Sequence, residues 1–86
     1  MRNSSKILVV DDDPNTVRLL QKWCENAGKS VIGAFNGQEG IVKAREEQPD
    51  LILLDVMLPD IGGMDVVRAL RRDSLTSAIP VFFITV

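Results

Sequence analysis

An uninterrupted apolar run in the middle of the chain most constrains the fold. Residues 51–54 read Leu-Ile-Leu-Leu without alternation, and the run ends at Asp55. A strand with one solvated face alternates apolar and polar residues, whereas a strand covered on both faces is apolar throughout. The run therefore predicts a strand that is buried on both faces of a sheet.

Strand and helix patterns alternate along the rest of the chain. Proline and glycine mark most of the boundaries: Pro14 follows a candidate N-cap, Asp13, and Gly28 stops the first helix. Gly40 is expected to weaken the second helix by about 1 kcal/mol relative to alanine. The predicted strands are residues 6–10, 30–35, 51–54 and 80–86, and the predicted helices are residues 14–27, 38–47 and 64–72. This order predicts an α/β fold with parallel strands and right-handed crossovers.

Length and composition limit the classes of function. The chain has 86 residues, 45% of them hydrophobic, and a formal net charge of −2. One modest core is expected, whereas disorder and a basic nucleic-acid-binding surface are not. No segment has the apolar length of a secretion signal or a membrane span. The single cysteine, Cys24, favours a reducing, cytoplasmic setting, and the lack of histidine excludes His-based catalysis and His-based metal sites.

Polar residues gather where the predicted strands end. Asp11 and Asp12 follow the first strand, Asp55 follows the third, and Thr85 lies at the end of the fourth. Ligands of open α/β sheets bind at this carboxyl edge. Neighbouring carboxylates repel unless a cation lies between them, and an all-oxygen set suits Mg²⁺. Such a site would let a carboxylate attack a phosphoryl group and form an aspartyl phosphate.

Other notable residues have simpler structural interpretations. Asp13 is expected to cap the first helix, and Trp23 is expected to pack in the core from that helix. Met64, Val67 and Leu70 are expected to share the buried face of the third helix. The arginines of this helix are interpreted as its solvated face: Arg68, Arg71 and Arg72.

Three segments together resemble a known family. They are KILVVDDDP at residues 6–14, PDLILLDVMLP at residues 49–59, and IPVFFIT at residues 79–85, with Gly63 between the last two. In this order they resemble the CheY-like receiver domain of response regulators in two-component signalling. The resemblance covers nearly the whole chain and implies a flavodoxin-like, doubly wound parallel sheet.

The resemblance also implies a role for each candidate residue. Asp55 would be the phosphoacceptor, Asp12 a direct Mg²⁺ ligand and Asp11 a ligand through water. The backbone carbonyl of Met57 would complete the protein ligands, and Thr85 would be the switch hydroxyl. The phosphoryl group would come from a phosphohistidine on a sensor histidine kinase or phosphotransfer protein. The chain would be a signalling protein and not an enzyme, with no direct contact to nucleic acid or membrane.

Two departures from the family's pattern stand out. Gly62 occupies a position where the family often has an acidic residue. The chain also stops at the fourth strand, so residues 1–86 are expected to form a receiver domain without its C-terminal helix–strand–helix part, with impaired activity. An uncovered fourth strand of β-prone, uncharged residues favours pairing between chains. We therefore expect a homodimer or larger assembly through that strand.

Two alternative functions remain at this point. Asp11-x-Asp13 after an apolar strand resembles the nucleophile motif of haloacid-dehalogenase-type phosphatases, although Pro14-Asn15 stands where that motif has Gly-Thr. Steady turnover that depends on Asp11 would favour this enzyme. The other alternative is a receiver-derived structural or assembly fragment without activity, which would bind no Mg²⁺ and form no acyl phosphate.

Overall fold

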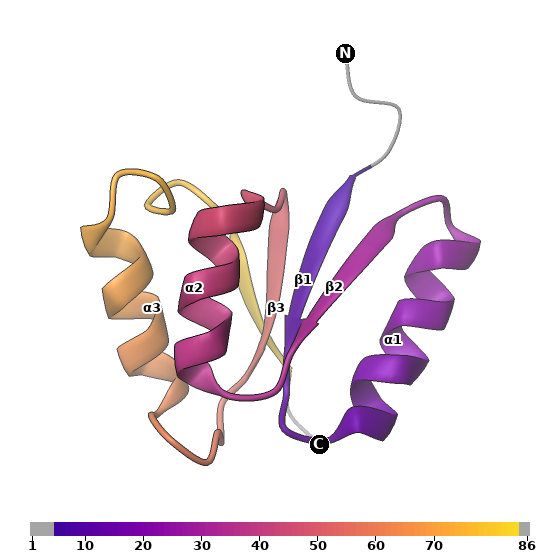
Figure 1. The fold of residues 1–86 in the computed structure, drawn as a ribbon, viewed down its shortest axis with the longest axis horizontal. Coiled ribbons are helices and arrows are strands. Elements are labelled where there is room, and N and C mark those ends of the chain that lie inside the picture. Colours follow the sequence, from indigo (N-terminus) through magenta and orange to yellow (C-terminus); the bar gives the residue numbers. More distant parts are fainter. Residues whose placement is uncertain (1–4, 85–86) are drawn as a thin grey trace.

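The structure is a computed structural model that describes residues 5–84 (Figure 1). Strands and helices alternate along the chain, as the sequence predicts. The strands are β1 (Lys6–Val10), β2 (Ser30–Ala34), β3 (Leu51–Asp55) and β4 (Val81–Ile84), and the helices are α1 (Pro14–Asn26), α2 (Gly37–Glu47) and α3 (Gly63–Arg72). The predicted boundaries differ from these by one residue at several ends, and the predicted 80–86 strand extends beyond the described residues.

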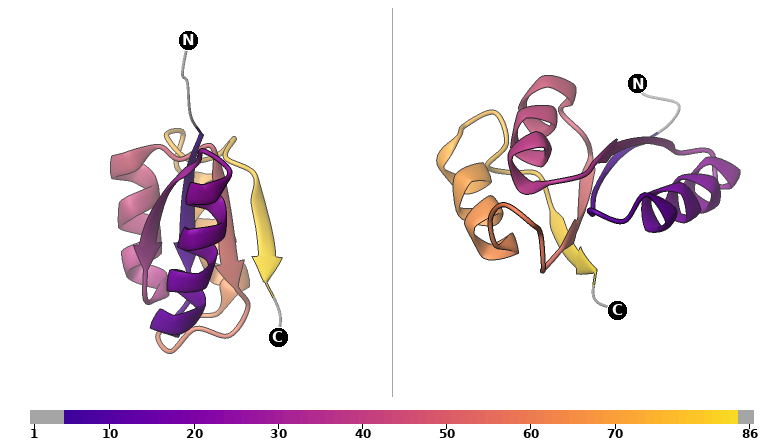
Figure 2. Two further views of the ribbon diagram at one scale, coloured as in Figure 1. Left: turned by 90° about the vertical axis from the view of Figure 1, so that its right-hand side faces the viewer. Right: turned by 60° about the horizontal axis from the view of Figure 1, so that its bottom comes forward.

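The four strands form one parallel sheet in the order β2-β1-β3-β4. This is the expected doubly wound, CheY-like α/β fold, described as far as β4. Helix α1 covers one face of the sheet, and α2 and α3 cover the other (Figure 2). Among the described helices, none is long and apolar enough to cross a membrane.

Strand β1 is buried on both faces and contributes to two separate cores. Leu8 and Val10 point toward α2 and α3, where they join the larger core, which includes Leu54 of β3. Ile7 and Val9 point toward α1 and pack in the smaller core. Side chains of a strand alternate between faces, so an unbroken apolar strand supplies both cores at once.

Helix α2 begins at a close contact with the sheet. Its N-cap is Asn36, whose Oδ1 accepts a hydrogen bond from the backbone N–H of Glu39 at 2.8 Å. A Cβ at position 40 would lie 2.9 Å from both Cγ atoms of Val10. The glycine that weakens the helix by propensity therefore lets α2 approach β1 directly beneath the carboxyl edge of the sheet.

Two packing predictions are wrong. Trp23 is 62% exposed, because α1 turns Val17 and not Trp23 toward the sheet. Met64 is 53% exposed, and the buried face of α3 consists of Gly63, Val66 and Leu70. In both helices apolar residues lie on more than one face, so spacing alone does not identify the buried one.

Arg71 is exposed, but it is not only a solvated side chain. Its guanidinium donates hydrogen bonds to the carbonyls of Ser77 at 3.1 Å and Ile79 at 2.9 Å. These bonds hold the connection between α3 and β4 against the end of α3. Arg68 is closer to the prediction, since its guanidinium pairs with the Asp65 carboxylate on the same exposed face, at 2.9 Å.

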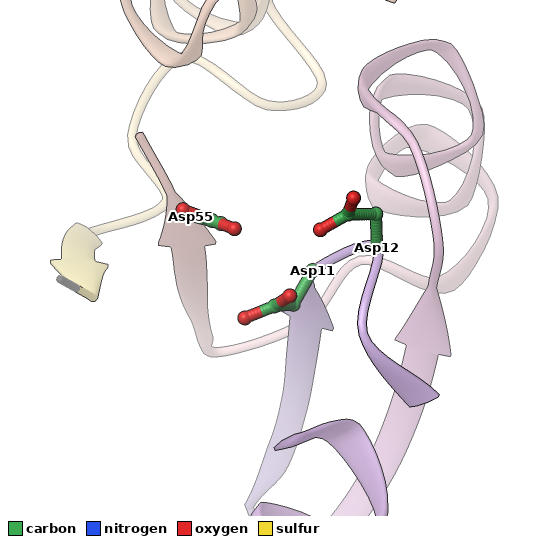
Figure 3. A group of neighbouring side chains, drawn as sticks. All are labelled: Asp11, Asp12 and Asp55. Carbon is green, nitrogen blue, oxygen red and sulfur yellow. The ribbon is translucent and has the colours of Figure 1, made fainter. Parts of the chain in front are cut away.

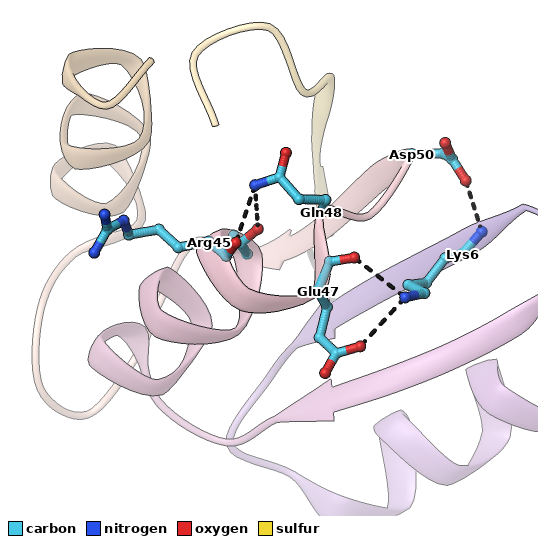
Figure 4. Close-up of polar contacts among 6 residues, drawn as sticks. Lys6, Arg45, Glu47, Gln48 and Asp50 are labelled. Atoms are coloured by element: carbon cyan, nitrogen blue, oxygen red, sulfur yellow. Dashed lines mark hydrogen bonds and ion pairs between the residues drawn. The ribbon is translucent and has the colours of Figure 1, made fainter. Parts of the chain in front are cut away.

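The amino edge of the sheet is held by polar contacts of its own (Figure 4). The backbone N–H of Lys6 donates to the Asp50 carboxylate at 2.8 Å. The Lys6 ammonium group donates to the Glu47 carbonyl at 3.2 Å and pairs with the Glu47 carboxylate at 3.3 Å. Gln48 ends α2 in the left-handed conformation, and its amide donates to the Arg45 carbonyl at 3.0 Å. These contacts lie opposite the edge where the acidic residues gather.

Candidate metal centre

Strand pairing brings the acidic residues of β1 and β3 to one edge. Val10 and Leu54 are register partners in the parallel β1–β3 ladder. Asp11 and Asp55, the residues that follow them, therefore lie side by side at the carboxyl edge. The Asp11 N–H also donates to the Ala34 carbonyl at 3.0 Å, which fixes this end of β1 against β2.

Three carboxylates meet at this edge. Asp11, Asp12 and Asp55 each offer one oxygen, and these oxygens lie within 4.8 Å of one another. Figure 3 shows the Asp12 and Asp55 side chains turned toward each other, with Asp11 at the tip of β1. Asp11 is buried, Asp55 is half-buried and Asp12 is exposed, so the cluster opens to solvent on the Asp12 side.

The electrostatics of the cluster favour a cation. Burial raises the pKa of the Asp11 carboxyl, and the negative charges of Asp55 and Asp12 raise this pKa further, against the lowering effect of the Asp13 N–H. A divalent cation would relieve this repulsion and favour the ionised form of Asp11. The donors are all oxygens, which suits a hard ion such as Mg²⁺. The residues present therefore fit the ion that the sequence predicts.

Asp13 faces away from this chemistry, as predicted. Its Oδ1 accepts a hydrogen bond from the Asn15 N–H at 2.9 Å, and its Oδ2 accepts one from the Thr16 hydroxyl at 3.3 Å. It is the N-cap of α1. Its backbone N–H donates to Asp11 Oδ1 at 2.9 Å, which orients the buried carboxylate toward the cluster.

The loop after β3 closes around Asp55. The Met57 N–H donates to Asp55 Oδ1 at 3.0 Å, and the Gly63 N–H donates to the Val56 carbonyl at 3.1 Å. Met57 therefore lies next to the cluster, while its side chain is 81% exposed.

Asp60 is a residue that the sequence analysis did not identify. Its two carboxylate oxygens accept hydrogen bonds from the N–H groups of Gly37 and Gln38, at 2.7 and 2.8 Å. An acidic residue after Pro59 in a loop carries no local signal of this contact, because its partners are more than twenty residues away in the sequence. Thr85, the predicted switch hydroxyl, lies outside the described residues; Ile84 before it pairs with Asp55 in the β3–β4 register.

Comparison with known protein families identifies the family of this chain. Residues 7–86 match the response regulator receiver domain family. The chain belongs to this family. Receiver domains are the signal-receiving parts of response regulators in two-component systems, and they generally bind Mg²⁺ at an acidic pocket.

Individual receiver-containing relatives cover the chain almost completely. It is 41% identical to the protein PilH of Pseudomonas aeruginosa over 94% of the chain and 67% of PilH. It is 46% identical to the alkaline phosphatase synthesis transcriptional regulatory protein PhoP of Bacillus subtilis, over 95% of the chain. Only 33% of that regulator is covered. The chain thus spans about two thirds of one relative and one third of the other.

Solved receiver structures have the same fold. The N-terminal domain of a response regulator receiver protein from Methanoculleus marisnigri superimposes with a TM-score of 0.90 at 36% identity, over 94% of the chain and 66% of that domain. The chemotaxis response regulator CheY4 of Vibrio cholerae also gives 0.90, at 30% identity, over 94% of the chain and 68% of CheY4.

Proposed function

We propose that this chain receives a phosphoryl group on Asp55 in a two-component phosphorelay. The observation that carries the proposal is the convergence of Asp11, Asp12 and Asp55 within 4.8 Å at the carboxyl edge of a receiver fold. A lone strand-end aspartate would need no such neighbours. The phosphoryl group would come from a phosphohistidine of a sensor histidine kinase or a phosphotransfer protein.

In this proposal the acidic residues hold Mg²⁺, and each has a separate task. Asp12 and Asp55 would bind the ion directly, the buried Asp11 would bind it through water, and the Met57 carbonyl would supply a backbone ligand. The bound ion supplies positive charge that offsets the charge of the phosphoryl oxygens. The raised pKa of Asp11 supports the assignment, because a neighbouring cation would favour the charged form that burial and the nearby carboxylates disfavour.

Asp55 performs the chemistry. The Met57 N–H occupies Oδ1, so we assign the attack to Oδ2. This oxygen forms a bond to phosphorus while the bond between phosphorus and the donor imidazole nitrogen breaks, and that nitrogen keeps the electron pair and takes a proton from solvent. The fixed position of Asp55 at the end of β3 supports an in-line approach.

The interaction of Asp13 favours this function over the phosphatase alternative. That enzyme's motif needs both Asp11 and Asp13 at the reacting centre. Both oxygens of Asp13 instead accept hydrogen bonds from the first turn of α1. Steady hydrolysis by the Asp11-x-Asp13 pair therefore has no support in the geometry.

We further propose that the chain associates with itself through β4 and works in the cytoplasm without contacting nucleic acid. Within residues 5–84, β4 pairs with β3 on one side and with no strand on the other. Phe82 and Phe83 are 62% and 42% exposed. An exposed edge with apolar side chains favours pairing with another chain. The free thiol of Cys24 is consistent with a reducing setting.

Binding of beryllofluoride, a mimic of the phosphoryl group, tests the site directly. With Mg²⁺ present, the wild-type chain should give a bound fluorine resonance that disappears in Asp55→Asn. Asp65→Asn is the matched control, because it removes an exposed carboxylate paired with Arg68 outside the cluster. A bound signal that persists in Asp55→Asn would contradict the assignment of the phosphoacceptor.

A further inference from the structure

The loop of residues 56–62 carries the Met57 carbonyl, yet the sheet does not determine its position. Pairing of β1 with β3 sets Asp11 and Asp55 relative to each other, and that register ends where the loop begins. The Met57 side chain is 81% exposed, so its packing cannot hold the backbone in place. The position of this carbonyl therefore depends on contacts that the loop itself makes. Close to Met57 these are the bond from its N–H to Asp55, the bond from the Gly63 N–H to the Val56 carbonyl, and the packing of Leu58 against the larger core. Asp60 adds a contact with α2.

Asp60 supplies a strong contact of this kind. Its Oδ1 and Oδ2 accept hydrogen bonds from the N–H groups of Gly37 and Gln38, at 2.7 and 2.8 Å. These groups belong to the first turn of α2, where N–H groups have no partner within the helix. A carboxylate in this position is also favoured by the helix dipole. Both oxygens of Asp60 are thus engaged by α2.

The residue after Asp60 fits closely against the same helix end. A Cβ at Gly37 would clash with the Ile61 side chain and lie 3.0 Å from Val66 Cγ2 of α3. Ile61 itself packs against the larger core. The Asp60–Ile61 segment is therefore held by two hydrogen bonds and by close packing on one turn of α2.

Helix α2 in turn packs against β1, the strand that ends just before Asp11. Gly40 lies against Val10, the residue before Asp11, as closely as a glycine allows. Asp11 itself is tied to the end of β2 through the Ala34 carbonyl. The contact of Asp60 with α2 thus connects the loop bearing Met57 to the part of the molecule that holds Asp11 and Asp12.

We propose that Asp60 is a positioning residue of the metal centre, which sets the Met57 carbonyl relative to Asp11, Asp12 and Asp55 through the first turn of α2. This inference rests on the proposed function, because it assigns Met57 to the cation. Asp60 does not bind the ion. Loss of a residue that orients a metal ligand typically weakens metal binding by about 10-fold to 100-fold.

Calorimetric titration with Mg²⁺ tests the proposal in four variants. Asp60→Ala removes both acceptors and should weaken binding by about tenfold, at the low end of such effects. Asp60→Asn keeps one acceptor oxygen and should recover part of that loss. Asn36→Ala removes the other cap of the same helix end, whose bond to Glu39 does not involve the loop. Asp65→Asn removes an exposed charge near the loop; both controls should bind Mg²⁺ as the wild type does.

Hydrogen exchange in metal-free protein gives an independent readout. The Met57 N–H, which donates to Asp55, should exchange faster in Asp60→Ala than in the wild type, and at the wild-type rate in Asn36→Ala. If Asp60→Ala does not fold, Asp60→Asn is compared with Asp65→Asn by both methods. Equal Mg²⁺ affinity in these two would then overturn the proposal.

Two further results would overturn the inference. Wild-type Mg²⁺ affinity in Asp60→Ala would show that the loop needs no such anchor. An equal loss in Asn36→Ala would assign the effect to helix stability. Failure of the proposed function looks different, because Mg²⁺ binding would then be insensitive to Asp12→Ala while the exchange of Met57 would still respond to Asp60→Ala.

Discussion

The Asp60 carboxylate accepts a hydrogen bond from the Gly37 N–H at 2.7 Å, across 23 residues of sequence. The contact joins the loop that follows Asp55 to the first turn of α2, the helix that precedes β3 in the sequence. It places a negative charge where the helix dipole favours one. The free N–H groups at the start of α2 are thus bound by Asp60, a residue that follows β3 in the sequence.

The pH dependence of stability should reveal this contact. Hydrogen bonds from Gly37 and Gln38 hold the pKa of Asp60 below its ordinary value of 3.8. A carboxyl whose pKa is lower in the folded state stabilises that state above the unfolded pKa, and this stabilisation disappears as pH falls through the folded pKa. Wild type should therefore melt higher than Asp60→Asn at pH 7, by a margin that narrows below pH 3.8. A margin that does not change with pH would contradict this account.

Asp12 and Asp13, which follow β1, should have different roles, one in Mg²⁺ binding and the other in capping α1. Asp12→Ala should weaken Mg²⁺ binding and leave metal-free stability nearly unchanged, because this exposed side chain belongs to the cluster. Asp13→Ala should cost about 1 kcal/mol of stability through the lost cap, which lowers Tm by about 4 to 8 °C in a domain of this size.

Calorimetry and thermal melts of both variants check this assignment. Asn15→Ala is a control for substitution in the first turn, since its side chain is in neither role and only its backbone N–H contacts Asp13. The reverse ranking of Mg²⁺ affinities would mean that the metal-binding pair is shifted by one residue, to Asp12 and Asp13.

Gly40→Ala should destabilise the protein despite the higher helix propensity of alanine. Propensity favours the substitution by about 1 kcal/mol. The added methyl would lie 2.9 Å from both Cγ atoms of Val10, which is fully buried, so one of the two side chains would have to shift within the core. Overpacking of a core typically costs about 1 to 3 kcal/mol.

A double-mutant cycle isolates this contact. Adding Val10→Ala to Gly40→Ala makes room for the new methyl, so the double variant should lose less stability than the sum of the single losses. Additive losses would show that α2 does not depend on close approach at this position.

Local patterns predict the elements of this fold well, and long-range contacts explain what they miss. The unbroken apolar run before Asp55 predicts a doubly covered strand, and its acidic end predicts the cluster at the sheet edge. Parallel pairing then brings Asp11 and Asp55 together, because the carboxyl ends of all strands meet at one edge. These inferences need only the period and the order of the elements.

The missed features depend on contacts between distant segments. Helical spacing places Trp23 and Met64 on apolar stripes, but only packing against the sheet decides which stripe is buried, and both are exposed. From the sequence alone, Asp60 would be interpreted as a solvated loop residue, because its contact with α2 is made only in the folded chain. Likewise, the sequence indicates only that Gly40 lowers helix propensity, whereas the structure shows that it allows α2 to approach Val10.

Self-association through β4 should appear in solution. At micromolar concentration the 86-residue chain should sediment as a dimer or larger species, because Phe82 is exposed and, within residues 5–84, β4 has a strand on one side only. Phe82→Lys should shift the population toward monomer, whereas Leu75→Lys, at a 51% exposed position outside the strand, should not. A wild-type chain that sediments as a sharp monomer and binds no hydrophobic dye would contradict this prediction.

Site mapping of the phosphoryl group tests the central claim most directly. The chain is incubated with acetyl phosphate and Mg²⁺, and the modified residue is located by mass spectrometry in the wild type, Asp55→Asn and Asp65→Asn. We expect one base-labile phosphoryl group on Asp55, which is lost in Asp55→Asn and retained in Asp65→Asn. Phosphate on Asp11, Asp12 or another residue of the wild type, or undiminished labelling of Asp55→Asn, would contradict it.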